Sequence, residues 1–333
     1  MTARQRLAEI VRSEFPKKTI LVLGDIMVDK YTRGKVSRIS PEAPIQILEF
    51  EESKLTAGGA SNVTANLVAL GARVELAGTA AEDEYGLWLR SAMQRAGVGT
   101  ECILAEAGRP TTLKERFATK SQQLLRVDRE KSGDITAETQ KAVLDWLKER
   151  IGRIDAVLLS DYRKGVLSSP EFVKRIIALC KSHGVIVAID SKSPSISAFA
   201  GATFVKPNNL ELEQAVNIRI TDDESLDRAG NLYLKTCGAR YLIVTRGARG
   251  ISVFSPDKAR QDFSSKALQV YDVTGAGDTV ISTITLGIVS GLSIEEATVL
   301  GNLAASVVVS KIGTAVASLD ELVARIGESL ENS

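Results

Sequence analysis

Short apolar runs alternate along the chain with longer segments in which apolar residues recur every three or four positions. The apolar runs are residues 19–24, 156–160, 185–189, 203–205 and 241–245. Because they lack polar alternation, they are typical of parallel strands that are covered on both faces. The segments with helical periodicity are residues 60–70, 85–96, 137–151, 170–183 and 222–236. This alternation predicts a doubly wound, mostly parallel α/β sheet whose ligands bind at the carboxyl ends of the strands.

Two stretches break this pattern and alternate polar with apolar residues, as antiparallel strands do. Residues 30–56 include the run from Ile45 to Phe50, and residues 111–128 include the runs 112–117 and 124–127. No helical segment separates the last two runs. We therefore predict that two insertions, about 30–56 and 111–128, form a small antiparallel β lid on a single domain that spans residues 1–333.

The segment from Tyr271 to Thr279 carries the strongest candidate chemistry. It follows a strand-like run, 266–271, and leads into an apolar stretch, 280–289, that predicts a helix. N–H groups at a helix N-terminus lack intrahelical partners and bind anions, and Gly275 and Gly277 let a phosphate approach the backbone. Asp278 would repel that phosphate, so it serves better as a base that accepts a proton from an attacking hydroxyl. The pattern favours phosphoryl transfer; the alternative is a glycine turn that Asp278 caps.

Two common phosphate-binding motifs do not fit this segment or the rest of the sequence. The dinucleotide fingerprint needs a glycine at the position of Val280. The P-loop needs a Gly-Lys pair with another glycine five residues earlier. The sequence has one Gly-Lys pair, Gly34-Lys35, and Asp29 stands five residues before it.

Further polar residues follow the first predicted strand. Gly24-Asp25 ends this strand, Asp29 comes four residues later, and Gly58 to Asn62 opens a helix. Fixed carboxylates and an amide at a strand-end cleft suit a polyhydroxylated ligand. A turn aspartate and a helix N-cap explain the same residues equally well, so both interpretations stay open.

Two motifs follow later strands. Asn208 and Glu211 predict either a capping box or a site for a hydrated magnesium ion and nucleotide phosphates, and the two are compatible. The glycines between Thr245 and Gly250 predict either a backbone that approaches a ligand or a tight hairpin.

Composition restricts the classes of function. The chain has 333 residues, a formal net charge of +1, 44% hydrophobic and 5% aromatic residues, which argues against nucleic acid and an anionic membrane as partners. Cys102, Cys180 and Cys237 are far apart and odd in number, which favours a reduced, cytoplasmic setting over a disulfide framework. The single histidine, His183, stands at a predicted helix C-terminus, and Ser-His-Asp catalysis and multi-histidine zinc sites are unsupported elsewhere.

Together these motifs resemble those of the ribokinase-like (PfkB) carbohydrate kinase family over nearly the whole chain. The motifs come in the family's order: Gly58-Gly59 with Asn62, Asn208 with Glu211, and Thr274 to Asp278. The resemblance implies a lid over a sugar, ATP as phosphoryl donor, Mg²⁺ held by Glu211 through water, and a monovalent cation as a further candidate. It implies that Asp278 is the catalytic base and that the anion hole is formed by Gly275, Ala276 and Gly277. The implied nucleotide contacts are Asn208, Asn209, Leu210, Glu211, Thr245, Gly247 and Asn302.

Within this family, the chain is similar to the kinases that phosphorylate O1 of D-glycero-β-D-manno-heptose 7-phosphate in lipopolysaccharide core synthesis. The similar segments are 24–31, 37–44, 122–124, 160–165 and 271–280. Two departures are Ser191, where proline is expected, and Thr245-Arg246-Gly247, which is closer to the broad family. Such kinases often carry a C-terminal adenylyltransferase domain with paired histidines, which His183 alone cannot supply, so we expect a stand-alone kinase.

Two alternatives stay open: a kinase for another sugar or sugar phosphate, such as ribose, fructose or a hexose phosphate, and a non-catalytic regulator that binds nucleotide or sugar. A regulator has no use for a base inside an intact anion-hole motif, which argues against the second. The expected substrate contacts are Asp25, Asp29, Gly58, Gly59, Asn62, Lys114, Arg116, Asp161 and Lys164.

The predicted lid suggests two further properties. A sugar that already bears a phosphate needs cations away from the nucleotide, and basic residues near the lid supply either that clamp or a solvated face: Arg33, Arg38, Lys114, Arg116, Arg126 and Lys164. The lid also has apolar residues that the main domain need not cover, including Ile45, Ile47, Leu48 and Phe117. Exposed apolar faces usually mark an interface, so we predict a homodimer in which two lids pack together.

Overall fold

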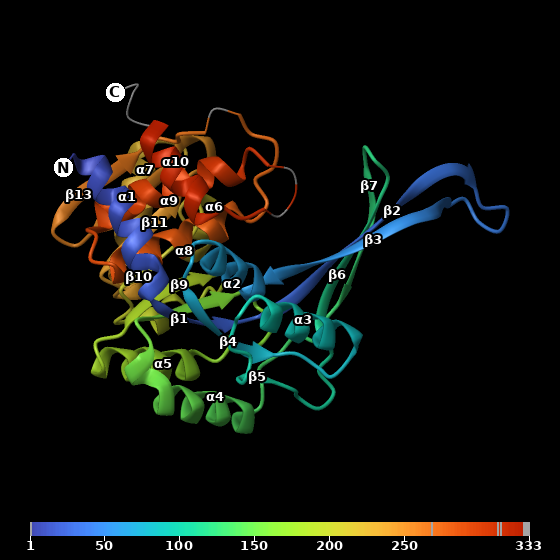
Figure 1. The fold of residues 1–333 in the computed structure, drawn as a ribbon, viewed down its shortest axis with the longest axis horizontal. Coiled ribbons are helices and arrows are strands. Elements are labelled where there is room, and N and C mark those ends of the chain that lie inside the picture. Colours follow the sequence, from blue (N-terminus) through green and yellow to red (C-terminus); the bar gives the residue numbers. More distant parts are fainter. Residues whose placement is uncertain (1, 268, 312, 314, 329–333) are drawn as a thin grey trace.

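The computed structural model describes residues 2–267, 269–311, 313 and 315–328. Within these residues the main sheet has nine strands in the order β13-β12-β11-β10-β9-β8-β1-β4-β5 (Figure 1). The strands are β1 (Thr19–Gly24), β4 (Arg73–Thr79), β5 (Ile103–Leu104), β8 (Ala156–Asp161), β9 (Ile186–Ser191), β10 (Phe204–Val205), β11 (Tyr241–Thr245), β12 (Ile251–Ser255) and β13 (Lys258–Phe263). The pairs from β5 to β11 are parallel, and β11, β12 and β13 pair antiparallel.

Helices cover both faces of this sheet, which confirms the doubly wound α/β prediction. On one face lie α1 (Ala3–Glu14), α2 (Ala60–Ala69), α3 (Glu84–Arg95), α8 (Ala276–Val289), α9 (Ile294–Val308) and α10 (Leu319–Glu328). On the other lie α4 (Ala137–Arg150), α5 (Pro170–Ser182), α6 (Asn209–Val216) and α7 (Asp223–Cys237). Short 3₁₀ turns occupy Phe15–Lys17, Ile151–Arg153, Ile196–Phe199 and Gly247–Arg249.

Strand β1 shows why an uninterrupted apolar run folds in this way. Ile20 and Val22 pack into the core under α2 and α8, while Leu21 and Leu23 pack into the core under α4 and α5. All four side chains are fully buried. A strand whose alternate side chains enter two cores has no position for a polar residue.

A smaller sheet projects from the main body (Figure 1). It contains β2 (Ile26–Ile39), β3 (Gln46–Gly59), β6 (Thr112–Ala118) and β7 (Gln123–Arg129), in the order β3-β2-β6-β7. Its two outer pairs are antiparallel hairpins, and the central pair of β2 and β6 is parallel. The predicted second sheet is thus confirmed. The two hairpins pair in parallel because β2 and β6 both start from the carboxyl ends of main-sheet strands. Strand β2 directly follows β1, and β6 is the next strand after β5.

The predicted strand at 266–271 is wrong over the residues that the structure describes there. Lys266, Ala267 and residues 269–271 form no strand. The backbone N–H of Tyr271 instead donates to Val309 O at the end of α9, over 2.8 Å, and Arg325 donates to Lys266 O over 2.6 Å. Because these backbone groups bond to helical residues distant in sequence, the segment runs along α9 and α10 rather than joining the sheet.

The predicted helices agree with the structure to within one or two residues, with one exception. Helix α8 begins at Ala276 rather than at Val280, so Asp278 lies in its first turn. His183 follows the last residue of α5, and its Nδ1 lies 3.0 Å from Leu179 O, as expected for a histidine at a helix C-terminus. Within the described residues, no helix has the length and apolar character needed to cross a membrane.

Candidate active site

A cavity of about 760 Å³ opens at the carboxyl ends of the parallel strands, between the main body and the smaller sheet. It brings together most of the residues expected from the sequence. On its wall are Asp29, Gly58, Gly59, Asn62, Lys114, Arg116, Asp161, Asn208, Glu211, Thr245, Gly247, Gly275, Ala276, Gly277, Asp278 and Asn302. The expected residues that are not among its lining residues are Asp25, Lys164, Asn209 and Leu210.

Asp278 lies in the first turn of α8, which packs beneath α2 and α9. Its carboxylate accepts hydrogen bonds from Asn62 Nδ2 over 2.6 Å and from Tyr162 Oη over 2.9 Å. The residue is 5% exposed. Burial, together with the negative charge of Asp190, raises the pKa of Asp278 to about 6, and the two hydrogen bonds and the charge of Lys206 keep it from rising further. A base with such a pKa is ionised at neutral pH and still close to the strength that proton abstraction needs.

The helix-capping interpretation does not describe Asp278. The residue that precedes α8 is Gly275, which has φ 81°, a conformation that side chains disfavour, and it makes no side-chain capping bond. Asp278 directs its carboxylate to two side chains of the cavity rather than to the backbone of its own helix. Gly275 and Gly277 bring the N-terminus of α8 to the cavity wall, where its N–H groups can face an anion.

A buried ion pair lies beside the N-terminus of α8. Lys206 Nζ is 3.1 Å from an Asp190 carboxylate oxygen, and Lys206 is 3% exposed. Burial alone would lower the pKa of Lys206, but Asp190 and Glu211 outweigh burial and raise it. Lys206 Nζ also lies 3.4 Å from the position that a Cβ atom on Gly277 would occupy. A permanent positive charge therefore adjoins the helix N-terminus.

The Asn208 and Glu211 motif forms the predicted capping box and also reaches the cavity. Asn208 N donates to Glu211 Oε2 over 2.8 Å, and Glu211 N donates to Asn208 Oδ1 over 2.9 Å. Burial and the charge of Asp190 raise the pKa of Glu211. The charge of Asp190 thus raises the pKa of both Glu211 and Asp278, and the positive charge of Lys206 opposes this at both carboxylates.

The end of the cavity beneath the smaller sheet is lined by cations. Arg116 is paired with Asp29 over 2.5 Å. Lys114 and Lys192 have no ion-pair partner among the described residues, and their ammonium groups lie 5.7 Å and 4.4 Å from the centre of the Tyr162 ring. Burial lowers the pKa of Lys114, and the neighbouring charges of Lys164 and Lys192 lower it further, against the opposing effect of Asp29. Positive charge at this end is thus incompletely neutralised.

Two expected sugar contacts lie elsewhere. Asp25 is 1% exposed, and its carboxylate accepts from the backbone N–H groups of Tyr162, Lys164 and Val166 over 2.8, 2.9 and 3.1 Å. It therefore holds the loop after β8 in place. The Lys164 side chain is paired with Glu130 over 2.6 Å.

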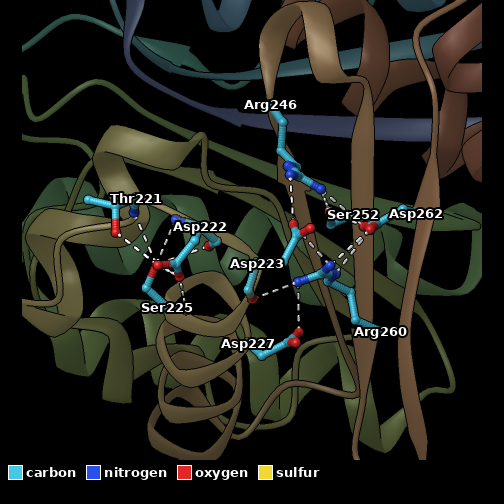
Figure 2. Close-up of polar contacts among 9 residues, drawn as sticks. All are labelled: Thr221, Asp222, Asp223, Ser225, Asp227, Arg246, Ser252, Arg260 and Asp262. Atoms are coloured by element: carbon cyan, nitrogen blue, oxygen red, sulfur yellow. Dashed lines mark hydrogen bonds and ion pairs between the residues drawn. The ribbon is translucent and has the colours of Figure 1, made fainter.

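The opposite end of the cavity is lined mostly by small and apolar residues, together with a few uncharged polar ones. The small and apolar residues are Gly247, Ala248, Gly250, Ala267, Val270, Val273, Ala305 and Val309, and the polar ones are Thr245, Ser265, Asn302 and Ser306. The turn at 245–250 is anchored through Arg246, whose polar contacts Figure 2 shows. Arg246 bonds to Ser252 of β12, Asp262 of β13 and Asp223 of α7, and Arg260 bonds to the same two aspartates. Because Arg246 is tied to two strands and a helix, the turn is held firmly against the cavity.

Asn302 also supports this end. Its side-chain amide donates to Ser264 O over 2.6 Å and to Phe263 O over 3.4 Å. It therefore fixes the segment after β13, which forms part of the wall. The amide already has these backbone acceptors, so Asn302 positions the wall as well as lining it.

Comparison with known proteins identifies the family of this chain. The model of the pfkB family of carbohydrate kinases matches residues 17–321. The chain belongs to the pfkB carbohydrate kinase family. The family implies a sugar kinase that uses ATP, and the known folds of this kinase class agree with the structure.

Similar solved structures include Arabidopsis thaliana ribokinase complexed with ribose and ATP (TM-score 0.75, 20% identity, 93% of this chain and 98% of that one). Another is phosphofructokinase-2 from Escherichia coli in complex with potassium (TM-score 0.75, 20% identity, 94% and 99%).

Sequence relatives of this PfkB kinase are more similar. The bifunctional protein HldE of Desulfatibacillum aliphaticivorans is 41% identical over 314 residues, which cover 94% of this chain and 64% of the relative. The HldE protein of a Nitratiruptor species is 42% identical over 306 residues, which cover 92% and 64%. The chain therefore spans a little under two thirds of the length of these relatives.

Sequence reasoning missed several residues that line the cavity of this PfkB kinase, among them the polar residues Tyr162, Asp190, Lys192 and Lys206. A signal was present for each of them. Asp190 and Lys192 stand at the end of β9, Tyr162 follows β8, and Lys206 follows β10. The rule that drew attention to Asp25 and Asn208, that polar residues at parallel strand ends meet at one edge, applies equally to them.

Proposed function

We propose that this kinase transfers the γ-phosphoryl group of ATP to O1 of D-glycero-β-D-manno-heptose 7-phosphate and produces the 1,7-bisphosphate. The observation that supports an already phosphorylated sugar is the pair of lysines beneath the smaller sheet, Lys114 and Lys192, which have no acidic partner among the described residues. A phosphate on the substrate would supply that partner, because phosphate and ammonium groups form charge-assisted hydrogen bonds. The resemblance to HldE proteins at about 40% identity favours a heptose as the sugar.

In this proposal the sugar binds between the smaller sheet and the N-terminus of α8. Asp278 accepts the proton of the attacking hydroxyl as that oxygen approaches the phosphoryl group. The N–H groups of Gly275, Ala276 and Gly277, with the ammonium of Lys206 nearby, stabilise the negative charge that spreads over the transferred group. The smaller sheet acts as a lid that excludes water, so that phosphoryl transfer to water does not compete.

Magnesium fits the acidic side of the cavity. Burial and the charge of Asp190 raise the pKa of Glu211, and a divalent cation nearby would relieve that repulsion. Within the described residues, no group of three or more His, Cys, Asp or Glu side chains could hold a metal, and magnesium usually keeps several waters. We therefore assign Glu211 a contact through water. When bound with ATP, Mg²⁺ neutralises charge on the phosphates.

A panel of sugars tests the function directly. ADP release from ATP would be measured with heptose 7-phosphate, unphosphorylated heptose, fructose 6-phosphate and ribose. We expect kcat/KM for heptose 7-phosphate to exceed that for heptose by roughly 10²–10⁴-fold, since two charged hydrogen bonds are lost without the phosphate. Phosphorus NMR would identify the phosphorylated oxygen. Higher kcat/KM for ribose or fructose 6-phosphate would contradict the heptose assignment, and no ADP with any sugar would favour a regulator.

We also propose that the lids of two copies pack together in a homodimer. Several apolar side chains of the smaller sheet are exposed, among them Ile39, Ile45, Phe50, Leu125 and Val127. Of the residues expected on this face, Ile45 is exposed and Ile47, Leu48 and Phe117 are half-buried. Such a concentration of apolar residues on one projecting element is typical of an interface.

Phe50→Glu should then convert the dimer to monomers and raise KM for the sugar, because each lid would lose the partner that stiffens it. Sedimentation velocity measures the first effect and steady-state kinetics the second. Leu87→Glu, on α3, is a matched control, because Leu87 is similarly exposed but lies outside the smaller sheet. Wild-type protein that sediments as a monomer at micromolar concentration would contradict the dimer.

A further inference from the structure

Tyr162 stands between the two features on which the proposed function depends. Its hydroxyl donates to Asp278 Oδ1 over 2.9 Å. The ammonium groups of Lys192 and Lys114 lie 4.4 Å and 5.7 Å from the centre of its ring. The same side chain therefore touches the carboxylate that accepts the proton and the two cations that face the sugar's phosphate. None of the sequence motifs discussed above includes such a role.

The loop that carries Tyr162 is fixed by two buried carboxylates. Asp25 accepts from Tyr162 N over 2.8 Å and from two further backbone N–H groups of the loop. Asp161 accepts from Arg163 N over 2.8 Å and from Ser191 Oγ over 2.6 Å. Arg163 has φ 60°, a conformation that a non-glycine residue keeps only where its surroundings enforce it. The loop thus holds Tyr162 at a defined position.

The hydrogen bonds at Asp278 leave room for a substrate. An ionised carboxylate has about four lone-pair positions, and Asn62 and Tyr162 occupy one on each oxygen. Two donors on opposite oxygens fix the plane of the carboxylate, while the remaining positions stay available for a hydroxyl. Orientation of this kind matters because a reacting group displaced by about 1 Å can lose roughly 100-fold in rate.

We propose that Tyr162 is a positioning residue that orients Asp278 and links it to the lysines that bind an anionic group on the sugar. The inference rests on the proposed function for the identity of that anionic group. An ammonium group over an aromatic ring is attracted to the ring's face, so Lys114 and Lys192 help to fix the ring. An anion bound by the lysines therefore lies at a set distance and angle from the base. The linkage makes a phosphorylated sugar a better substrate through kcat as well as through binding.

Tyr162→Phe removes the hydroxyl and keeps the ring. We expect kcat to fall by about 10- to 100-fold, with the KM values for ATP and sugar changed less than about threefold. The acid limb of the kcat/KM profile should move to higher pH. The sign follows from the hydrogen bond, which favours the ionised carboxylate, so that its loss raises the pKa of Asp278.

Tyr85→Phe is a matched control. Tyr85 is buried, whereas Tyr162 is half-buried, and it also lies near two cations, Lys30 and Arg129, at 5.9 Å and 5.7 Å. Its hydroxyl is not bonded to Asp278, which accepts from Asn62 and Tyr162. We expect wild-type kcat and pH profile from this variant. If Tyr162→Phe and Tyr85→Phe have the same kcat and the same acid limb of the kcat/KM profile, the proposed positioning role is contradicted.

The measurement separates this inference from the proposed function. It uses whichever sugar gives the highest kcat/KM in the panel, so that a wrong heptose assignment leaves the Tyr162 comparison intact. If no sugar is turned over, NMR titration of the Asp278 carboxyl gives the same answer, with Asp278→Asn used to assign the signal. A higher carboxyl pKa in Tyr162→Phe than in Tyr85→Phe supports the inference, and equal values overturn it.

Discussion

The two ends of the cavity are lined by different kinds of side chain. The end beneath the smaller sheet carries charged side chains, among them Asp29, Lys114, Arg116 and Lys192, whereas the end beside β11 and α9 carries glycine, alanine and valine. At the first end, charge and hydrogen bonding decide what binds, because ammonium groups without an ion-pair partner form charge-assisted hydrogen bonds with an anionic ligand. At the second end, shape decides, because small apolar residues offer space and backbone. A substitution should therefore act through charge at one end and through volume at the other.

The largest effect is expected where the two ends meet, at Asp278. Asp278→Asn keeps the size of the side chain but removes the base, so kcat should fall by roughly 10²–10⁴-fold while nucleotide affinity is largely kept. In the wild type, kcat/KM should decline as pH falls through about 6, because burial raises the pKa of Asp278 to about 6 and the protonated form cannot accept a proton. Steady-state ADP release from pH 5 to 9 and equilibrium nucleotide binding measure both. Turnover near the wild-type rate would contradict the base.

At the charged end, Lys192→Met tests whether charge selects the substrate. Methionine keeps much of the side-chain length, and the lost ammonium should raise KM for the phosphorylated sugar by about 10- to 100-fold, the range for one charged hydrogen bond. KM for ATP should stay unchanged. Lys120→Met is the control, because Lys120 is exposed on the turn of the same sheet and does not line the cavity. Equal KM increases for ATP and sugar would remove the distinction between the two ends.

The sequence was more informative about the shape of the fold than about this charged end. A strand such as β1 can be predicted because each of its residues enters a core, and the same pattern recurs in β8 and β11. Strand-end residues were found by position alone, and position does not determine where a side chain turns. The carboxylate of Asp25 accepts hydrogen bonds from the backbone of the loop after β8. The carboxylate of Asp29, four residues later, instead pairs with Arg116 on the cavity wall.

Contacts between distant segments account for the other differences. Residues 266–271 have a strand-like pattern, but the carbonyl that binds Tyr271 belongs to Val309, which no local pattern reveals. Tyr162 lies in one of the similar segments, but no role for it or for Lys192 follows from the sequence. Their roles emerge only when β8 and β9 place Tyr162 against Asp278 and Lys192 over the Tyr162 ring. Asn208 and Glu211 illustrate the opposite case, since both halves of a capping box lie within four residues and the predicted bonds are present.

The apolar end includes Gly247 and Asn302, two of the nucleotide contacts that the family resemblance implies, so we propose it as the nucleotide end of the cavity. Ala305→Leu tests whether volume selects the nucleotide there. Ala305 lies on the cavity wall in α9, and three additional carbons there should crowd the nucleotide and raise KM for ATP by about tenfold, equivalent to about 1.4 kcal/mol. KM for the sugar should not change. Val299→Leu provides the control, because Val299 lies on the same helix but outside this cavity. A larger change in sugar KM than in ATP KM would contradict the assignment of the ends.

The smallest effect is expected from Glu211→Gln, at the boundary of the nucleotide end. Glutamine serves at the third position of a capping box as well as glutamate does, so the variant should keep α6 and the melting temperature while losing the negative charge. We expect the magnesium concentration needed for half-maximal turnover to rise a few-fold, because the removed charge no longer holds the ion's hydration shell. Asn208→Ala separates the two roles, since it removes the cap and leaves the carboxylate, and it should lower the melting temperature. An unchanged magnesium titration for Glu211→Gln, together with a lower melting temperature, would mean that Glu211 acts only on the helix.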